Sequence, residues 1–236
     1  MGTIKYEKKA DMNFQDMGNG LNRALMLPDA FEGVETYKCK LAAGCKAEPE
    51  IYNDRIQIFF FTKGTGYIGT KNRAHNITEV AVFVPMQDTE EFFIQAGTDM
   101  EYLNLIVKMN DFDYEEFNKV RMVLPSFSLL SNCVQYYEGF KGPSVKSYTI
   151  VEHDNLARIS MGVVTGTGPE VVGEHFHVNL QQWYYGLDDG SFTYTADGDS
   201  VQMKDGDFSC IPKGTKHSVR AEKDEKINYV WFELKC

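Results

Sequence analysis

The sequence predicts an all-β fold built from two similar halves, and three observations support this. Short segments rich in Val, Ile, Phe, Tyr and Thr recur along the chain, separated by turns such as KGTG (63–66) and KDGD (204–207). Helical spacing is confined to the middle of the chain. The parts on either side of that stretch carry the same order of strand, turn and proline signals. Together these features predict two β-sandwiches or jelly rolls within 236 residues.

The internal repeat rests on three pairs of segments that occur in the same order in both halves. The pairs are IQIFFFTKGTGYIG (56–69) with QWYYGLDDGSFTYT (182–195), EVAVFVP (79–85) with GDFSCIP (206–212), and MEYLNLIVKM (100–109) with INYVWFELKC (227–236). The first pair reads as strand, glycine-containing turn and strand, the second ends in proline, and the third is a closing strand. Sequence identity between the halves is low, so the repeat is carried by the order of these signals.

A helical connector is expected between the halves. The stretch DFDYEEFNKVRMVLPSFSLLSNCVQYYEGF offers an Asp cap, acidic residues in a first turn and an interruption at Pro125. These signals predict a partly helical connector at roughly 113–140. The expected division is an amino-terminal domain with its arm over 1–112, a connector over 113–146 and a carboxy-terminal domain over 147–236.

Composition and charge exclude several classes of function. A net charge of −10 with scattered lysines argues against a nucleic-acid partner. No apolar run approaches the roughly 18 to 20 residues of a membrane span, and no apolar segment follows the charged amino terminus as it would in a secretory signal. The five cysteines are odd in number and lack CxxC spacing, which is typical of reduced thiols. We therefore expect a cytoplasmic protein without a membrane or nucleic-acid partner.

Two of the five histidines, His175 and His177, form an HxH pair in the stretch GEHFHVNLQQWYYG. Side chains two residues apart on a strand share a face, so both rings can reach one ion. Neutral imidazole suits Zn, Fe, Ni, Cu and Mn centres, although two ligands alone bind weakly. A third candidate is His217, which follows the turn-forming Pro212 and Gly214 in GDFSCIPKGTKHSV.

These residues resemble the two motifs of the cupin superfamily, G(x)5HxH(x)3-4E(x)6G and G(x)5PxG(x)2H(x)3N. The second motif is matched by Gly206, Pro212, Gly214 and His217, with Ala221 in place of the final Asn. The first is matched by its two histidines but lacks its acid. The resemblance covers 147–236 well and 30–109 faintly. It implies a bicupin, that is, two double-stranded β-helix (jelly-roll) domains, with a metal motif only in the carboxy-terminal one.

A glutamine stands where the family has its acid, and two positions are possible. In one unbroken strand Gln181 would share the face of His177, whereas counting back from the hairpin turn places the family's acid at Gln182. We expect Gln182, with Gln181 as the alternative. The implied ligand set is His175, His177, Gln182 and His217. It is neutral and would leave one divalent ion per chain, Zn, Mn, Fe or Ni, with its full charge. In the alternative, Gln182 does not touch the ion and three histidines hold it.

The first copy has no histidine at the corresponding positions. The repeat places Glu50, Tyr52, Gln57 and Glu90 opposite His175, His177, Gln182 and His217. These side chains make a poor set for a transition metal, so we expect the first domain to be metal-free.

Near the second site, Tyr184 has the strand parity of Gln182 and could act as a general acid or hydrogen-bond a substrate, with a core tyrosine as the alternative. The resemblance implies a metal-dependent isomerase, lyase or hydrolase acting on a small polar substrate such as a sugar, sugar acid or ureido compound. An Fe- or Ni-dependent dioxygenase and a non-catalytic binding module are the alternatives. By the same resemblance we expect a homodimer.

Overall fold

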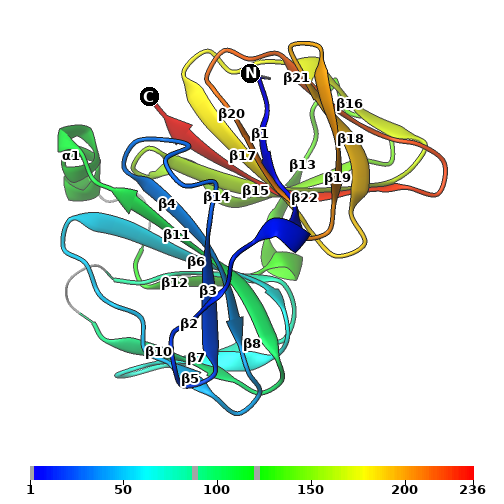
Figure 1. Ribbon diagram of the computed structural model, residues 1–236. Coiled ribbons are helices and arrows are strands. Elements are labelled where there is room, and N and C mark those ends of the chain that lie inside the picture. The colour runs from blue at the N-terminus through cyan, green and yellow to red at the C-terminus, as the bar shows by residue number, and fades with distance from the viewer. Residues whose placement is uncertain (1–2, 87–89, 120–122) are drawn as a thin grey trace. The chain divides into compact units, whose positions relative to one another are not determined.

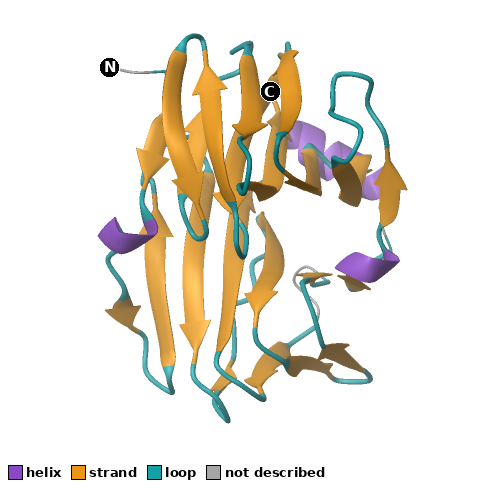
Figure 2. Ribbon diagram, turned by 90° about the vertical axis from the view of Figure 1, so that its right-hand side faces the viewer, coloured by secondary structure: helices purple, strands orange, loops and turns teal. Residues whose placement is uncertain are grey.

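A computed structural model describes residues 3–86, 90–119 and 123–236 and confirms the all-β fold class. Strands dominate, and helix is confined to short segments (Figure 2). These are α1 (Asp111–Lys119) and the 3-10 helices η1 (Lys9–Asp11) and η2 (Leu130–Asn132). Within the described part of the chain, no helix has the length and apolar character needed to cross a membrane.

The chain forms two compact units. The amino-terminal unit is Met12–Asn132, and the carboxy-terminal unit is Cys133–Cys236 together with the residues up to Asp11. The start of the chain belongs to the carboxy-terminal unit because β1 (Lys5–Glu7) pairs with β20 (Phe208–Ile211). This assignment differs from the sequence-based grouping of the arm with 1–112.

Strands make up nearly all the regular structure of each unit. In the amino-terminal unit they are β2 (Gln15–Asp16), β3 (Leu21–Met26), β4 (Val34–Leu41), β5 (Lys46–Ala47), β6 (Arg55–Lys63), β7 (Gly66–Thr70), β8 (Ala74–Ile77), β9 (Ala81–Val84), β10 (Phe92–Ala96), β11 (Met100–Lys108) and β12 (Ser126–Leu129). In the carboxy-terminal unit, β1 and β20 are joined by β13 (Val134–Tyr136), β14 (Lys146–Leu156), β15 (Ile159–Thr167), β16 (Glu170–His175), β17 (Leu180–Gly186), β18 (Ser191–Ala196), β19 (Asp199–Lys204), β21 (His217–Ala221) and β22 (Lys226–Lys235).

The two units have the same strand order. One sheet runs β12-β9-β6-β11-β4-β3-β2 in the amino-terminal unit, and its counterpart runs β1-β20-β17-β22-β15-β14-β13 (Figure 1). A second layer runs β5-β10-β7-β8 in the first unit and β16-β21-β18-β19 in the other. The segments that align in sequence therefore occupy equivalent places, because β6, β7, β9 and β11 correspond to β17, β18, β20 and β22.

Each unit buries its own apolar core between the two layers. In β18 the burial alternates, with Phe192, Tyr194 and Ala196 inside and the residues between them less buried, as a strand with one face on a core requires. These three side chains pack in a cluster that includes Tyr184 and Tyr229. The site described below lies against this core.

The connector is helical over a shorter stretch than the sequence predicts. Its helix is α1, whose start is capped reciprocally: Asp113 N donates to Asn110 Oδ1, and Asn110 N donates to Asp113 Oδ2, each at 3.0 Å. The sequence predicts a partly helical connector over roughly 113–140, of which residues 120–122 lie outside the described residues and Leu130–Asn132 forms the 3-10 helix η2. Ser126–Leu129 and Val134–Tyr136 instead pair with β9 and β14 at sheet edges. This pairing satisfies the backbone groups on one side of each strand, and it could not be anticipated from local spacing.

Candidate metal centre

Three histidines converge in the carboxy-terminal unit because two strands pair in one register. His175 ends β16 and His217 begins β21, and the two residues are partners across the antiparallel ladder. Their ring centroids are 4.2 Å apart. His177 follows the end of β16, with its ring centroid 5.2 Å from that of His175 and 5.5 Å from that of His217. Candidate ligand atoms of the three side chains all lie within 4.8 Å of one another.

The turn before β21 fixes the position of His217. Gly214 has a φ of +76°, a left-handed conformation that favours glycine, which explains this residue of the motif. Its N–H donates to His177 O at 3.0 Å, so the turn is tied to the loop that carries the second histidine.

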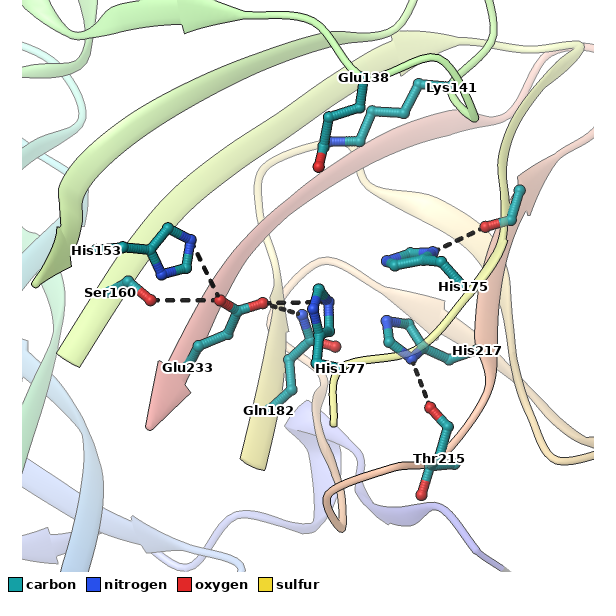
Figure 3. A network of polar contacts seen from close by, with 11 residues as sticks. Glu138, Lys141, His153, Ser160, His175, His177, Gln182, Thr215, His217 and Glu233 are labelled. Carbon is teal, nitrogen blue, oxygen red and sulfur yellow. Dashed lines mark hydrogen bonds and ion pairs between the residues drawn. The ribbon is translucent and has the colours of Figure 1, made fainter. Parts of the chain in front are cut away.

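Backbone contacts orient two of the rings. His175 Nδ1 lies 2.8 Å from Gly173 O, and His217 Nδ1 lies 3.0 Å from Thr215 O (Figure 3). A neutral ring that donates from Nδ1 presents the Nε2 lone pair, which is the form that binds a metal ion. His217 Nε2 is buried and has no hydrogen-bond partner among the described residues. The lone pair of this nitrogen is therefore available to bind a metal ion.

Burial keeps these imidazoles neutral. Burial, followed by the neighbouring His175, lowers the pKa of His217 to about 3 and that of His177 to about 4. Burial also lowers the pKa of His175. All three rings are consequently unprotonated at neutral pH and available as ligands.

Gln182 lies beside the histidines on β17, 4% exposed. Its Nε2 donates to Glu233 Oε1 at 2.8 Å. Its Oε1 is buried and accepts no hydrogen bond from the described residues, an uncommon situation for a buried carbonyl. Gln182 lines the cavity, whereas Gln181 is not among the lining residues.

Glu233 is a site residue that the sequence analysis missed. It lies on β22 directly opposite Gln182 in the strand register. Its Oε1 is 3.4 Å from His177 Nε2, and its Oε2 accepts from Ser160 Oγ at 3.3 Å and lies 3.8 Å from His153 Nε2. Strand parity offered a signal, since Tyr229, Trp231 and Glu233 alternate along β22 and all line the cavity.

The carboxyl of Glu233 has a raised pKa. Burial raises its pKa to about 7, opposed by the hydrogen bonds from Ser160 and Gln182. Because the pKa of His177 is about 4, the contact between these two side chains is not an ion pair at neutral pH. Glu233 can therefore gain or lose a proton near pH 7.

Tyr184 lines the cavity from the core side and is 2% exposed. Its ring centroid is 4.4 Å from that of Tyr229 and 6.1 Å from that of His217. Burial and the neighbouring phenols raise its pKa well above the ordinary value. The phenol stays protonated, so it can donate a hydrogen bond but cannot serve as a base.

His175 and His177 line a cavity of about 290 Å³. At about 30 Å³ per water-sized group, it has room for about ten such groups. Figure 3 shows Glu138 and Lys141 above the histidines, opposite Thr215. The lining residues are Tyr136, Glu138, Lys141, Thr149, His153, Val164, Val172, His175, His177, Gln182, Tyr184, Tyr229, Trp231 and Glu233.

The donor set fits a divalent transition ion. Three neutral imidazoles are close enough to share one ion, and two buried polar atoms, His217 Nε2 and Gln182 Oε1, lack hydrogen-bond partners among the described residues. Imidazole nitrogen and amide oxygen are ordinary ligands for Zn, Mn, Fe and Ni.

At the corresponding positions of the amino-terminal unit, the side chains of Tyr52 and Gln57 both bond to Glu50, one to its carboxylate and the other to its backbone carbonyl. Tyr52 Oη donates to Glu50 Oε2 at 2.9 Å, and Gln57 Nε2 donates to Glu50 O at 2.6 Å. In the part of the chain that the structure describes, the three histidines are the one group of His, Cys, Asp or Glu that meets the geometry of a metal site.

Comparison with known proteins agrees with a cupin fold. Residues 163–233 match the family described as Cupin domain. No curated protein matches the chain. Solved structures with low identity share its fold across nearly the whole chain. A putative glyoxylate induced protein from Pseudomonas aeruginosa has a TM-score of 0.82 at 11% identity, covering 98% of this chain and 89% of its own.

Two further structures show the same likeness. The protein Ylba from E. coli has a TM-score of 0.75 at 10% identity, covering 100% of this chain and 91% of its own. A mutant of Bacillus subtilis oxalate decarboxylase has a TM-score of 0.73 at 13% identity, covering 98% of this chain and 76% of its own. The description of another structure of that decarboxylase names its Mn(II) centres. At these identities the likeness establishes the fold alone.

Proposed function

We propose that the protein is a bicupin with one catalytic metal centre, in the carboxy-terminal domain. The common strand order of the two units supports the bicupin architecture. In this proposal the two cupin domains are the units Met12–Asn132 and Cys133–Cys236, the second with the arm up to Asp11. The division expected from the sequence, 1–112, 113–146 and 147–236, places the arm and the connector differently.

The bound ion is one divalent transition metal per chain, held by His175, His177, His217 and Gln182 Oε1. The observation that carries this proposal is the cluster of three neutral imidazoles, two of which line one cavity together with Gln182, whose buried amide oxygen has no partner among the described residues. Mn is a leading choice because a structurally similar decarboxylase is described as having Mn(II) centres. Zn, Fe and Ni suit the same donors.

The chemistry best supported is redox-neutral catalysis on a small polar substrate by an isomerase, lyase or hydrolase. When bound, the ion supplies Lewis acidity that polarises a carbonyl or hydroxyl oxygen. Glu233, whose Oε1 lies 3.4 Å from His177 Nε2 on the cavity side, accepts or returns the substrate proton. Tyr184 donates a hydrogen bond from its protonated phenol.

Metal content tests the site. We expect the purified wild type to carry about one ion per chain and the His175→Ala/His217→Ala variant to lose it, because two of the four ligands are removed. Elemental analysis measures both, with His75→Ala, on the amino-terminal unit, as the matched control. Unchanged metal content in the double variant would disprove the proposed centre.

Turnover under defined atmospheres tests the reaction class. A redox-neutral enzyme should convert sugars, sugar acids or ureido compounds anaerobically with Zn, Mn or Ni. The second candidate, an Fe- or Ni-dependent dioxygenase, is kept because three histidines also suit those ions. It predicts oxygen uptake with phenolic, thiol or diketone substrates. Ligand-dependent thermal stabilisation without product would indicate a binding module.

The proposal also covers the oligomeric state of the protein and its location in the cell. We infer a cytoplasmic homodimer acting on small molecules, and sedimentation of the purified protein tests the dimer.

A further inference from the structure

A buried lysine faces the same cavity as the histidines. The Lys141 side chain is 5% exposed, and its Nζ lies 2.5 Å from Glu138 Oε2 and 2.7 Å from Ser147 Oγ. The same nitrogen lies 4.9 Å from the centroid of the Tyr136 ring. An ammonium this deeply buried is costly unless an anion accompanies it.

The segment that carries Lys141 is fixed against the strand that carries His175. Gly142 N donates to Val171 O, and Gly173 N donates to Phe140 O, each at 2.8 Å. The Phe140 ring stacks on the His175 ring with centroids 4.3 Å apart. These contacts therefore fix the position of the Lys141 ammonium relative to His175, which lines the same cavity.

The two side chains of the Lys141–Glu138 ion pair differ in how far they can move. The lysine is enclosed, whereas the Glu138 side chain is 36% exposed and stands at the cavity wall. A half-exposed carboxylate can turn into solvent at little cost, while the buried ammonium cannot follow it. Another carboxylate entering the cavity could take its place.

The charges of the lining favour an anionic ligand once an ion is bound. The lining then includes the divalent ion, the Lys141 cation, and two carboxylates, Glu138 and Glu233. With both carboxylates ionised the cavity retains a net charge of about +1, and displacement of Glu138 raises it. Burial lowers the pKa of Lys141 and Glu138 opposes that effect, so an anion at this position favours the charged lysine.

We propose that the substrate is a small organic carboxylate, whose carboxylate group displaces Glu138 from Lys141 while another oxygen of the molecule faces the histidines. This inference rests on the proposed function and narrows its substrate to a chemical class. The cavity of about 290 Å³ limits the ligand to a compact molecule. Lys141 positions this ligand by a charge-assisted hydrogen bond.

The test uses glycolate and its neutral isostere glycolamide as probes, titrated by calorimetry into zinc-loaded and chelator-treated protein. We expect the wild type to bind glycolate at least about tenfold more tightly than glycolamide, which is typical of a hydrogen bond between charged partners. Lys141→Met should abolish this preference while the zinc content stays the same. Glu138→Gln should strengthen glycolate binding by about threefold or more, since a neutral amide competes less well for the ammonium.

Lys38→Met is the matched control. Lys38 is another buried lysine, paired with Glu101 at 2.7 Å in the amino-terminal unit, and its loss should leave the glycolate preference intact. Equal binding of both probes by zinc-loaded wild type would overturn the inference and leave the metal centre standing. Glu138→Gln replaces a half-exposed residue, so it still tests the inference if Lys141→Met fails to fold. Unchanged or weaker glycolate binding by the Glu138→Gln variant would also overturn the inference.

Failure of the proposed function gives a different result. If the wild type binds none of zinc, manganese, iron and nickel, the metal centre is wrong. The chelator-treated series then still reports whether Lys141 selects the carboxylate. A glycolate preference that persists in both forms of Lys141→Met would overturn the lysine's role whatever the zinc content.

Discussion

Gln182 is the residue that most distinguishes this site, because an amide stands where the resemblance to cupins implies an acid. Its two ends face different partners: Nε2 donates to Glu233, and Oε1 remains unpartnered among the described residues. The amide thus links a carboxylate that titrates near neutrality to the proposed ion. Gln181, one residue earlier, does not line the cavity.

Replacement of each glutamine separates the two alternatives left by the sequence. We expect Gln182→Ala to weaken metal binding by about 10- to 100-fold, the range found when groups that ligate or support a metal are removed. Gln181→Ala should change the affinity little. Competition with a chromogenic chelator measures both. Equal losses, or a larger loss in Gln181→Ala, would contradict the assignment.

Glu233 predicts a pH dependence in the metal-free protein. The pKa of this carboxyl is 4.5 in the unfolded chain and about 7 when folded, so folding favours its protonated form. Its contribution to stability is full below pH 4.5 and is lost as the pH rises through 7. At 1.36 kcal/mol per pKa unit, the wild type should lose about 3 kcal/mol relative to Glu233→Gln over that interval.

Urea unfolding of chelator-treated protein at pH 4.5, 6 and 8 measures this difference. Comparison with Glu233→Gln cancels the opposite trend from the histidines, whose lowered pKa values make stability fall as the pH drops below 6.5. A constant difference between the two proteins would show that Glu233 does not titrate in this range. Bound metal should reduce the effect, because a nearby cation favours the ionised carboxyl.

Among the elements, β1 shows how a remote segment completes the unit that holds the site. Tyr6 Oη donates to Asp207 Oδ2 at 2.6 Å, and Lys9 N donates to Asp207 Oδ1 at 2.9 Å. Asp207 is buried and precedes β20, the strand that pairs with β17. The arm therefore covers the sheet edge next to the strand that carries Gln182.

Tyr6→Phe removes one bond to this carboxylate and leaves the backbone donors in place. We expect a loss of about 1.5 to 3 kcal/mol in unfolding free energy, the usual contribution of a hydrogen bond to a charged group. Both tryptophans, Trp183 and Trp231, lie in the carboxy-terminal unit, so their fluorescence during urea unfolding follows that unit. Tyr114→Phe, at an exposed position of α1, is the control. Equal stability of wild type and Tyr6→Phe would mean that the arm is not anchored through this bond.

The elements also show how far the sequence alone could lead. Strands, turns and the repeat were visible because apolar alternation and glycine turns are local signals, and the histidines could be found by motif spacing. Glu233 and Lys141 were not identified, because their positions depend on pairing with Gln182, 51 residues from Glu233, and with Val172. The pairing of Lys5–Glu7 with Phe208–Cys210 joins segments far apart in the chain and left no local pattern.

At the scale of the whole molecule, two units of the same strand order have different interiors. The carboxy-terminal unit brings three histidines together, whereas in the other unit Glu50, Tyr52 and Gln57 bond to one another. A shared fold therefore does not imply a shared site, since the ligands depend on a few side chains at strand ends. The amino-terminal unit still contributes an apolar core of its own.

This asymmetry predicts where a metal ion stabilises the chain. An ion bound only by the native carboxy-terminal unit stabilises that unit by mass action, by about 2.7 kcal/mol when free metal is 100 times its dissociation constant. Hydrogen exchange followed by mass spectrometry should therefore show slower exchange in β16, β17 and β21 on adding Zn or Mn, and unchanged exchange in β6 and β9. The His175→Ala/His217→Ala variant should show no response in either unit. Slower hydrogen exchange in β6 of the wild type, with two ions bound per chain, would instead indicate a second metal centre in the amino-terminal unit. That result would contradict the assignment of metal binding to one domain.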